Sequence, residues 1–447
     1  GYVLNIARKI TAAVMLAGVL TVCGCSAESP RSGVLQNSAV TYSDEESSAI
    51  SAFEIPMLAS NTETPCLTFL GTGEISTAAL NTYANTVGLS TSETPVTIVH
   101  VSDYQYESRL SELINSDESP DLTEKRENTF PFLMSKNIYE DLTSYMDAAA
   151  PQWEEFSSYI DHYSFKGAHY FYPTGITVSP QIMLYDKMRC VQFNIPDPEK
   201  LYEKGEWTMD RLIDCAEQLD TSLGIDSYFY ASGVAENIFN STGAALIEKD
   251  ENGKFVSRIG SRNYLDMRSF FSVYRCNQDD QRTDPLRTAM SMFMCTDERT
   301  LGELRTLSPS FNVGIVPFPQ FDSDGTYYVR AVSEGFLVPK GAKNIRNAAS
   351  FINCSRIAET SDDGIKERRR EMKKLGLLQS DVEWMEFIRG GDYELVLDEG
   401  LCLDRDANAA IKLIFSSADE ILLEGNAKPD YNIAAIDTDL ERINAML

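Results

Sequence analysis

The stretch CLTFLGTGE, Cys66 to Glu74, is where the sequence first predicts regular structure. An apolar run ends at Gly71, which indicates a short strand, and a helix is expected to follow and to reach about Val87. A second apolar strand, PVTIVHV, covers Pro95 to Val101. The next predicted helix, Tyr104 to Asn115, places its large apolar residues on one face. This order of strand, helix, strand and helix predicts a parallel sheet with right-handed crossovers.

The rest of the chain predicts a mixture of strands and helices. The stretch YFYPTGITVSPQIMLY, Tyr170 to Tyr185, alternates in polarity, which indicates two strands that cross between parts of the fold. Thr208 is expected to cap a helix that ends near Leu219, with Trp207 packed against its first turns. Further strands are expected at Ala289 to Cys295, at Phe311 to Phe318 and at Ala331 to Val338, the last two joined by a hairpin turn at Asp324 and Gly325. Further helices are expected at Glu236 to Phe239, Arg262 to Cys276, from Thr296 onward, Asn347 to Cys354, Asp362 to Gly376, Asp381 to Ile388, Ala407 to Glu424 and Ile433 to Met446.

The N-terminal residues are expected to direct export. Two basic residues precede an apolar run from Ile10 to Val22, which is too short for a comfortable membrane span. The sequence VCGC, Val22 to Cys25, resembles the lipobox of bacterial lipoproteins. By that resemblance Cys25 is lipidated and becomes the mature N-terminus. Two alternatives stay open, an uncleaved anchor and an ordinary signal cut near Ala27. The Ser- and Thr-rich segment that follows, up to residue 65, is expected to be a disordered tether.

Length and charge restrict the function. With 447 residues the chain is long enough for two domains and a sizeable core. The formal net charge is -28, and a surface this acidic repels phosphate backbones. We therefore expect no nucleic-acid partner.

The cysteines and histidines predict no metal site. Apart from Cys23 and Cys25, seven of the nine cysteines remain; they are widely spaced and contain no CxxC motif, so buried free thiols are expected rather than a zinc site or a disulfide framework. These seven are Cys66, Cys190, Cys215, Cys276, Cys295, Cys354 and Cys402. The three histidines form no HExxH motif, and no metal or cofactor is expected.

Eight motifs occur in order along the chain. They are TFLGTG at Thr68 to Gly73, YESRLSELINSDESPDL at Tyr106 to Leu122, YEDLTSYMD at Tyr139 to Asp147, YPTGITVSPQIMLYDK at Tyr172 to Lys187, EWTMDRLIDCAEQL at Glu206 to Leu219, TAMSMFM at Thr288 to Met294, VGIVPFP at Val313 to Pro319 and SEGFLVPKGAKNIRNAASFI at Ser333 to Ile352. In this order and spacing they resemble bacterial extracellular solute-binding proteins of ABC importers, in the sugar-binding family that includes maltose-binding protein. The helical segment Asp362 to Leu395 matches no motif of that family.

The resemblance implies an α/β fold of the type II periplasmic-binding-protein kind, with two lobes, several hinge crossings and the ligand in the cleft between the lobes. Residues 66–175 and 320–395 would form the first lobe, and residues 185–319 and 398–447 the second. Residues 1–24 would be the lipoprotein signal peptide, and residues 25–65 the lipidated cysteine and its tether. The resemblance also implies a monomer on the outer face of the cytoplasmic membrane. It would close on a small polar solute, with a mono- or oligosaccharide as the leading class, and deliver it to the transmembrane subunits of an ABC permease.

A cleft for sugars needs aromatic platforms and polar groups that pair with hydroxyls. Polar residues at strand ends, at loop-helix junctions and at the crossings are therefore the candidates, since parallel sheets bind ligands at the carboxyl ends of their strands. The candidates in the first lobe and at the crossings are Thr72, Glu74, Glu124, Arg126, Tyr172 and Glu334. The candidates in the second lobe are Glu236, Asn237, Asn240, Thr296, Asp297 and Arg299.

Structural roles compete with some of these functional ones. The competing role for Glu74 is purely structural, that of an acidic residue in the first turn of a helix. Trp207 is more often a helix staple than a sugar platform, and Trp384 and Phe239 are more often core residues. The basic residues from Lys366 to Lys374 are expected to form a solvated helix face.

Two other functions stay open. An exported glycosidase would need two carboxylates about 5–10 Å apart, and with 67 acidic residues such pairs occur by chance. No nucleophile elbow, SxxK or zinc motif is present, so we expect no enzyme. A sensor or adhesin built on the same two lobes would function without a permease.

Overall fold

The computed structural model describes residues 63–447 except 179–181, 225–228, 232–233, 274–275, 278–291, 308, 310–311, 322–324, 392 and 421–432. The predicted signal, Cys25 and nearly all of the predicted tether lie outside the described residues, as do parts of the strand expected from Ala289 and of the hairpin turn expected at Asp324. In the described ranges, no helix is long and apolar enough to cross a bilayer.

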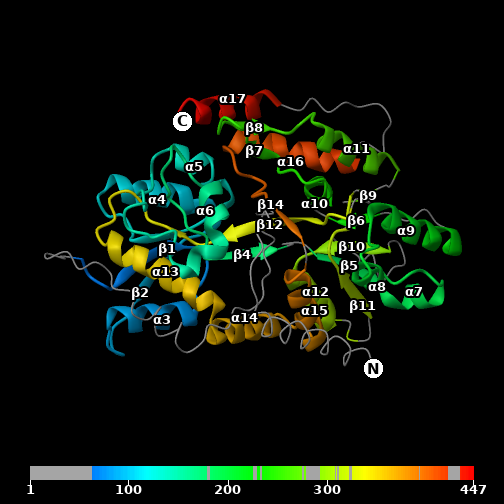
Figure 1. Cartoon of the computed structure of the whole chain (residues 1–447), viewed down its shortest axis with the longest axis horizontal. Coiled ribbons are helices and arrows are strands. Elements are labelled where there is room, and N and C mark those ends of the chain that lie inside the picture. Colours follow the sequence, from blue (N-terminus) through cyan, green and yellow to red (C-terminus); the bar gives the residue numbers. More distant parts are fainter. Residues whose placement is uncertain are drawn as a thin grey trace, which may run out of the picture.

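The first sheet has four strands in the order β13-β3-β1-β2 (Figure 1, left). Its strands are β1 (Leu67–Gly71), β2 (Val96–His100), β3 (Leu122–Glu124) and β13 (Phe336–Leu337). Both β2 and β3 run parallel to β1, which confirms the predicted parallel sheet. The helices that belong to this sheet include α3 (Thr77–Val87), α4 (Tyr106–Asn115) and α13 (Ile345–Thr360). Because Ser76 caps α3 and Gly88 ends it in the left-handed conformation, α3 has the predicted length.

The second sheet has five strands in the order β11-β5-β10-β6-β9 (Figure 1, right). Its strands are β5 (Ile182–Asp186), β6 (Phe229–Ala231), β9 (Cys276–Asn277), β10 (Phe293–Thr296) and β11 (Val313–Val316). Strand β5 is antiparallel to both of its neighbours, whereas β6, β9 and β10 run parallel to each other. Helix α9 (Met209–Leu223) begins where predicted, because the Thr208 side chain accepts a hydrogen bond from the Arg211 N–H.

A third sheet lies between these two and contains the crossing strands (Figure 1). Strand β12 (Tyr328–Glu334) is its centre, with β4 (Gly175–Val178) on one side and β14 (Glu394–Leu397) on the other. The predicted hairpin between β11 and β12 is wrong, because β11 pairs with β5 in the second sheet while β12 pairs with β4 and β14.

The remaining elements surround the three sheets. Between the end of β2 and β4 these are η1 (Asp103–Gln105), η2 (Glu127–Thr129), α5 (Phe132–Ser135), η3 (Pro151–Phe156) and α6 (Ser157–His162). Between β5 and β11 they are α7 (Lys187–Gln192), α8 (Pro198–Glu203), α10 (Val234–Ser241), β7 (Ile247–Lys249), β8 (Phe255–Ser257), α11 (Arg262–Val273) and α12 (Glu298–Leu307). The last ones are α14 (Asp362–Lys374), α15 (Gln379–Arg389), α16 (Arg405–Glu420) and α17 (Ile433–Asn444).

Helices α14 and α15 connect the surroundings of the first and second sheets (Figure 1, bottom). Helix α14 packs against α3 and α13, whereas α15 packs against α14 and β11. One apolar cluster is also continuous between the two sides, since it contains Leu70 and Phe130 as well as Met183 and Trp207. The predicted lobe boundaries stay a prediction. The segment Asp362 to Leu395, which matches none of the motifs quoted above, contains the two helices that connect both sides.

Candidate functional site

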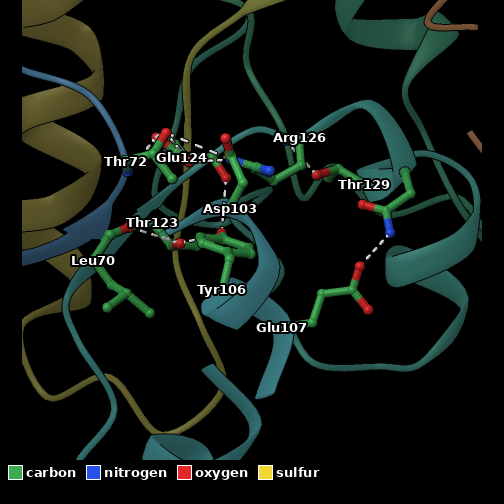
Figure 2. A network of polar contacts seen from close by, with 10 residues as sticks. Leu70, Thr72, Asp103, Tyr106, Glu107, Thr123, Glu124, Arg126 and Thr129 are labelled. Carbon is green, nitrogen blue, oxygen red and sulfur yellow. Dashed lines mark hydrogen bonds and ion pairs between the residues drawn. The ribbon is translucent and has the colours of Figure 1, made fainter. Parts of the chain in front are cut away.

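Three of the predicted residues, Thr72, Glu124 and Arg126, lie together where β1 and β3 end (Figure 2). The Glu124 carboxylate accepts hydrogen bonds from the Thr72 backbone N–H at 2.9 Å and from the Thr72 hydroxyl at 3.0 Å. Arg126 Nη1 donates to the same carboxylate at 2.9 Å. These residues lie at the carboxyl ends of parallel strands, the edge at which such sheets bind ligands.

The pairing of β1 with β3 brings these residues together. Leu70 lies opposite Thr123 in the register, so Glu124 comes one residue after this pair and Thr72 two residues after it. Tyr106 of α4 supports the end of β3, because its hydroxyl contacts the Thr123 hydroxyl and donates to the Glu124 carbonyl at 3.0 Å. The predicted convergence of these residues thus follows from two adjacent parallel strands and one supporting tyrosine.

A fourth residue, Asp103, joins the group and was not predicted. It is the first residue of η1, shortly after β2, and its Oδ1 lies 2.7 Å from Arg126 Nη1. Burial alone would lower the pKa of the Arg126 guanidinium, but hydrogen bonds with Glu124 and Asp103 outweigh burial and raise that pKa above its usual value. We call Thr72, Asp103, Glu124 and Arg126 the rim cluster. The sequence signal that could have indicated Asp103 is its position as a polar residue just after β2, which pairs in parallel with β1.

The other candidates from this part of the chain lie apart from the rim cluster. Glu74 is exposed, with its carboxylate 3.9 Å from the His100 ring nitrogen. Tyr172 is almost fully buried, packs edge-on against a core ring, and has its pKa raised to about 12 mainly by burial. Glu334 is exposed at the end of β12 and accepts a hydrogen bond from the Thr177 hydroxyl.

Glu236 lies on α10, beyond the crossing sheet. Its carboxylate is 3.4 Å from Arg330 Nη1 on β12. Burial raises the pKa of Glu236, Arg330 opposes this, and the negative charges of Asp398 and Glu127 add to it. Glu127 directly follows Arg126, so a charge next to the rim cluster in the chain contributes to the raised pKa of Glu236. In the part of the chain that the structure describes, no hydrogen bond or ion pair joins Glu236 to the rim cluster itself.

The two asparagines of α10 have buried positions. Asn237 and Asn240 are both almost inaccessible to solvent. Asn240 Nδ2 donates to the Asp398 carboxylate at 2.7 Å and to the Ala244 carbonyl at 3.0 Å. These contacts fix the end of β14 to α10.

The remaining candidates lie where β10 leads into α12. Thr296 is buried at the end of β10, and Arg299 is exposed on the helix. Asp297 accepts a hydrogen bond from the Thr300 N–H at 2.8 Å, which is a capping contact at the start of α12. Among the described residues, no hydrogen bond or ion pair joins these three to the rim cluster.

A buried ion pair involves the residue between Glu124 and Arg126 of the rim cluster. Lys125 pairs with Glu399, and the two side chains are only 4% and 7% exposed. Glu399 also accepts hydrogen bonds from the Tyr163 hydroxyl and from the Ser333 hydroxyl, the latter at 3.1 Å. We call Lys125, Tyr163, Ser333 and Glu399 the buried lysine network. It joins the end of β3 to the crossing strand β12 and to the residues that follow β14.

The fold, but no sequence family, is matched by known proteins. Neither a family model nor a curated protein matches the sequence. An ABC substrate-binding protein from Listeria monocytogenes in complex with cycloalternan matches with a TM-score of 0.53 at 12% identity, over 85% of this chain and 98% of that one.

Two further structures match equally well. One is the galacto-N-biose/lacto-N-biose I-binding protein of an ABC transporter from Bifidobacterium longum, with a TM-score of 0.53 at 13% identity over 84% of this chain and 98% of that one. The other is the cyclic alpha-maltosyl-1,6-maltose binding protein from Arthrobacter globiformis, with a TM-score of 0.55 at 12% identity over 85% and 98%. The chain has the solute-binding-protein fold. The predicted α/β fold class of two lobes with several crossings is thereby confirmed.

Proposed function

We propose that this chain is the substrate-binding protein of an ABC transporter and that it binds a small polar solute, a mono- or oligosaccharide. The observation that carries the proposal is the position of the rim cluster. In a fold shared with solute-binding proteins, it offers carboxylate, hydroxyl and guanidinium groups at the carboxyl ends of three parallel strands.

The ligand class is supported from two directions. The three similar structures are described as binding proteins for cycloalternan, lacto-N-biose and a cyclic maltosyl-maltose, all of which are saccharides. Charged donors and acceptors of both kinds are also what a polyhydroxylated ligand requires, since each hydroxyl can donate and accept. Similarity to binding proteins likewise supports a role in binding rather than in catalysis.

Uptake by this protein would need no bond chemistry. A ligand that contacts the rim cluster on one side and α10 on the other favours the state in which both contacts are made. The crossing strands β4, β12 and β14 are the connections about which the two sides would rotate. The closed state would then be the form recognised by the transmembrane subunits of the permease.

The proposal includes a lipid anchor at Cys25 on the outer face of the cytoplasmic membrane. We expect the full-length protein, produced in a bacterium that processes lipoproteins, to be found in the membrane fraction and to carry the added mass of the lipid. Cys25→Ser should release the protein and remove that mass. Cys23→Ser is the matched control, because this residue is proposed to leave with the signal. Equal behaviour of the two variants would contradict the anchor.

Ligand binding is tested with a panel of mono- and disaccharides. A sugar that binds only the folded protein should raise the melting temperature, give a heat of binding by calorimetry, and reduce the radius of gyration in X-ray scattering. If no saccharide produces any of these changes, the proposed function fails.

The role of the rim cluster is tested by Glu124→Gln. Removing one charged hydrogen-bond acceptor is expected to weaken binding about 10- to 100-fold. Glu118→Gln is the control, because Glu118 is exposed and precedes β3, at the opposite end of the strand. The same loss of affinity in both variants would place the ligand elsewhere.

A further inference from the structure

The rim cluster carries an excess of negative charge around its single cation. Asp103 Oδ1 and Glu124 Oε1 lie 2.7 Å and 2.9 Å from the same nitrogen, Arg126 Nη1. The single positive charge of the guanidinium is therefore paired with two negative charges even without a ligand. Two carboxylates and one guanidinium leave this group with a net charge of about -1 at neutral pH.

Neighbouring acidic residues add to this negative charge. Glu127 follows the rim cluster in the chain, and its charge contributes to the raised pKa of Glu236, whose carboxylate lies 3.4 Å from Arg330. Arg330 in turn pairs with the Glu236 carboxylate and donates to the Asp398 carbonyl. Within the rim cluster, Arg126 already has two acidic partners, whereas recognition of a carboxylate or phosphate group needs a cation that is free to pair with it.

Asp103 is the accessible carboxylate of the rim cluster. Its side chain is 78% exposed, compared with 17% for Glu124. The contact with Arg126 uses one of its oxygens, and an oxygen of this kind can accept further hydrogen bonds from hydroxyl groups. Arg126 can in turn donate through its other N–H groups. An ion pair this exposed contributes little to stability, so the fold does not explain why Asp103 occupies this position.

We propose that Asp103 binds the ligand directly and that the rim cluster selects uncharged saccharides over anionic ones such as uronic acids and sugar phosphates. This inference rests on the proposed function and adds the charge class of the ligand to it. Hydroxyls of a neutral sugar would bridge the free positions of the Asp103 carboxylate and the Arg126 guanidinium. A carboxylate or phosphate at the same place would face Asp103, Glu124 and Glu127, with Arg126 already paired to the first two.

The test uses calorimetry on the unmodified protein. It compares glucose, galactose, mannose and their disaccharides with the corresponding uronic acids and 6-phosphates. For each sugar that binds, we expect the neutral form to bind at least tenfold more tightly than its anionic counterpart. The difference should increase at low salt, because repulsion between exposed charges is then less screened. Asp103→Asn should weaken binding of the neutral sugar about tenfold or more and reduce the discrimination against the anion.

The control is Asp117→Asn, which removes an equally exposed carboxylate, 3.7 Å from Lys343, at the other end of β3. Both variants should keep the melting temperature of the unmodified protein, and only Asp103→Asn should change binding. An anionic sugar that binds as tightly as its neutral counterpart, or unchanged binding by Asp103→Asn, overturns the inference and leaves the proposed function intact. If no saccharide of either kind binds, the proposed function itself fails, and the inference fails with it.

Discussion

Lys125 and Glu399 show how single residues connect distant parts of the chain. They are 274 positions apart, yet they form a buried ion pair that also contacts Tyr163 and Ser333. Next to Glu399, Asp398 makes its contacts with α10 instead. Two consecutive carboxylates thus contact different elements, Glu399 the end of β3 and Asp398 helix α10.

The first prediction concerns this buried ion pair. Lys125→Met should lower the free energy of unfolding by about 3–5 kcal/mol, because the Glu399 carboxylate then stays buried without a cation. Urea denaturation measures the change. Lys343→Met is the control, since it removes an exposed pair with Asp117 and should cost about 0–1 kcal/mol. Similar losses in the two variants would show that the buried pair is not special.

The second prediction concerns His162, whose ring lies against Phe130 and Tyr163. Burial, with the positive charge of Lys249 added, lowers its pKa to about 4 from an unfolded value of about 6.5. Between these values the unfolded chain binds more protons, so this residue makes stability rise as pH increases from 4 to 6.5.

Urea denaturation at several pH values tests this prediction. Across the interval the unmodified protein should gain on the order of 3 kcal/mol relative to His162→Gln. If the difference between the two proteins does not change with pH, the histidine is not responsible.

Sequence patterns could predict part of the candidate site at this scale. Thr72 was found because it follows the first strand of the parallel sheet, and Glu124 because it follows the motif that ends in PDL at Leu122. Asp103 carries a comparable signal, since it comes shortly after β2, but only the folded chain shows that it pairs with Arg126. The Lys125–Glu399 pair could not be predicted at all, since only the folded chain brings its two residues together.

At the scale of elements, local pattern predicted most helices and failed for some strands. The helices α3, α4, α14 and α15 were predicted close to their observed bounds, because caps and amphipathic spacing are local signals, whereas α9 and α13 begin near the predicted residue and end several residues later. The hairpin of β11 and β12 was wrong and β14 was missed, because strands need partners and these partners are far away in the sequence. Four residues, ELVL, become β14 only by pairing with β12.

The third prediction concerns the joint between α14 and α3. The Glu367 carboxylate accepts hydrogen bonds from the N–H groups of Thr77 and Ala78 and from the Ser76 hydroxyl, at 2.8–2.9 Å. It therefore caps a helix other than its own. Glu367→Ala should lower the free energy of unfolding by about 1–3 kcal/mol, whereas Glu371→Ala on the same helix, at an exposed position, should change it by less than about 0.5 kcal/mol.

The same hydrogen bonds give the Glu367 contribution a direction with pH. Burial opposes them, but together they hold the pKa of Glu367 below its usual value. The stabilisation is therefore fully present above the unfolded pKa of about 4.5 and is lost as pH falls through the folded pKa. Denaturation curves at pH 7 and pH 3 should show the cost of Glu367→Ala shrinking at the lower pH. A constant cost would mean that side-chain packing, and not the charge, holds α14 on α3.

At the scale of the whole molecule, charge is the dominant property. With a formal net charge of -28, repulsion among carboxylates destabilises the compact state. The fourth prediction is that the melting temperature rises as ionic strength increases from about 10 mM to 0.5 M, because the Debye length falls from about 30 Å to a few Å. Thermal scans in sodium chloride and in choline chloride should give the same rise, since screening does not depend on which cation provides it. A melting temperature that falls with salt would show that attractive ion pairs outweigh the repulsion.

The free thiols described by the structure have a practical consequence for refolding. Cys190, Cys215, Cys354 and Cys402 are buried, and burial raises the pKa of each thiol, that of Cys215 to about 12, so the folded protein keeps these four protonated and out of reach of oxidants. Unfolding exposes these thiols at once, at positions far apart in the chain. In air, a heated sample should cross-link at random and precipitate, whereas a reducing agent should let the same sample regain its native state on cooling.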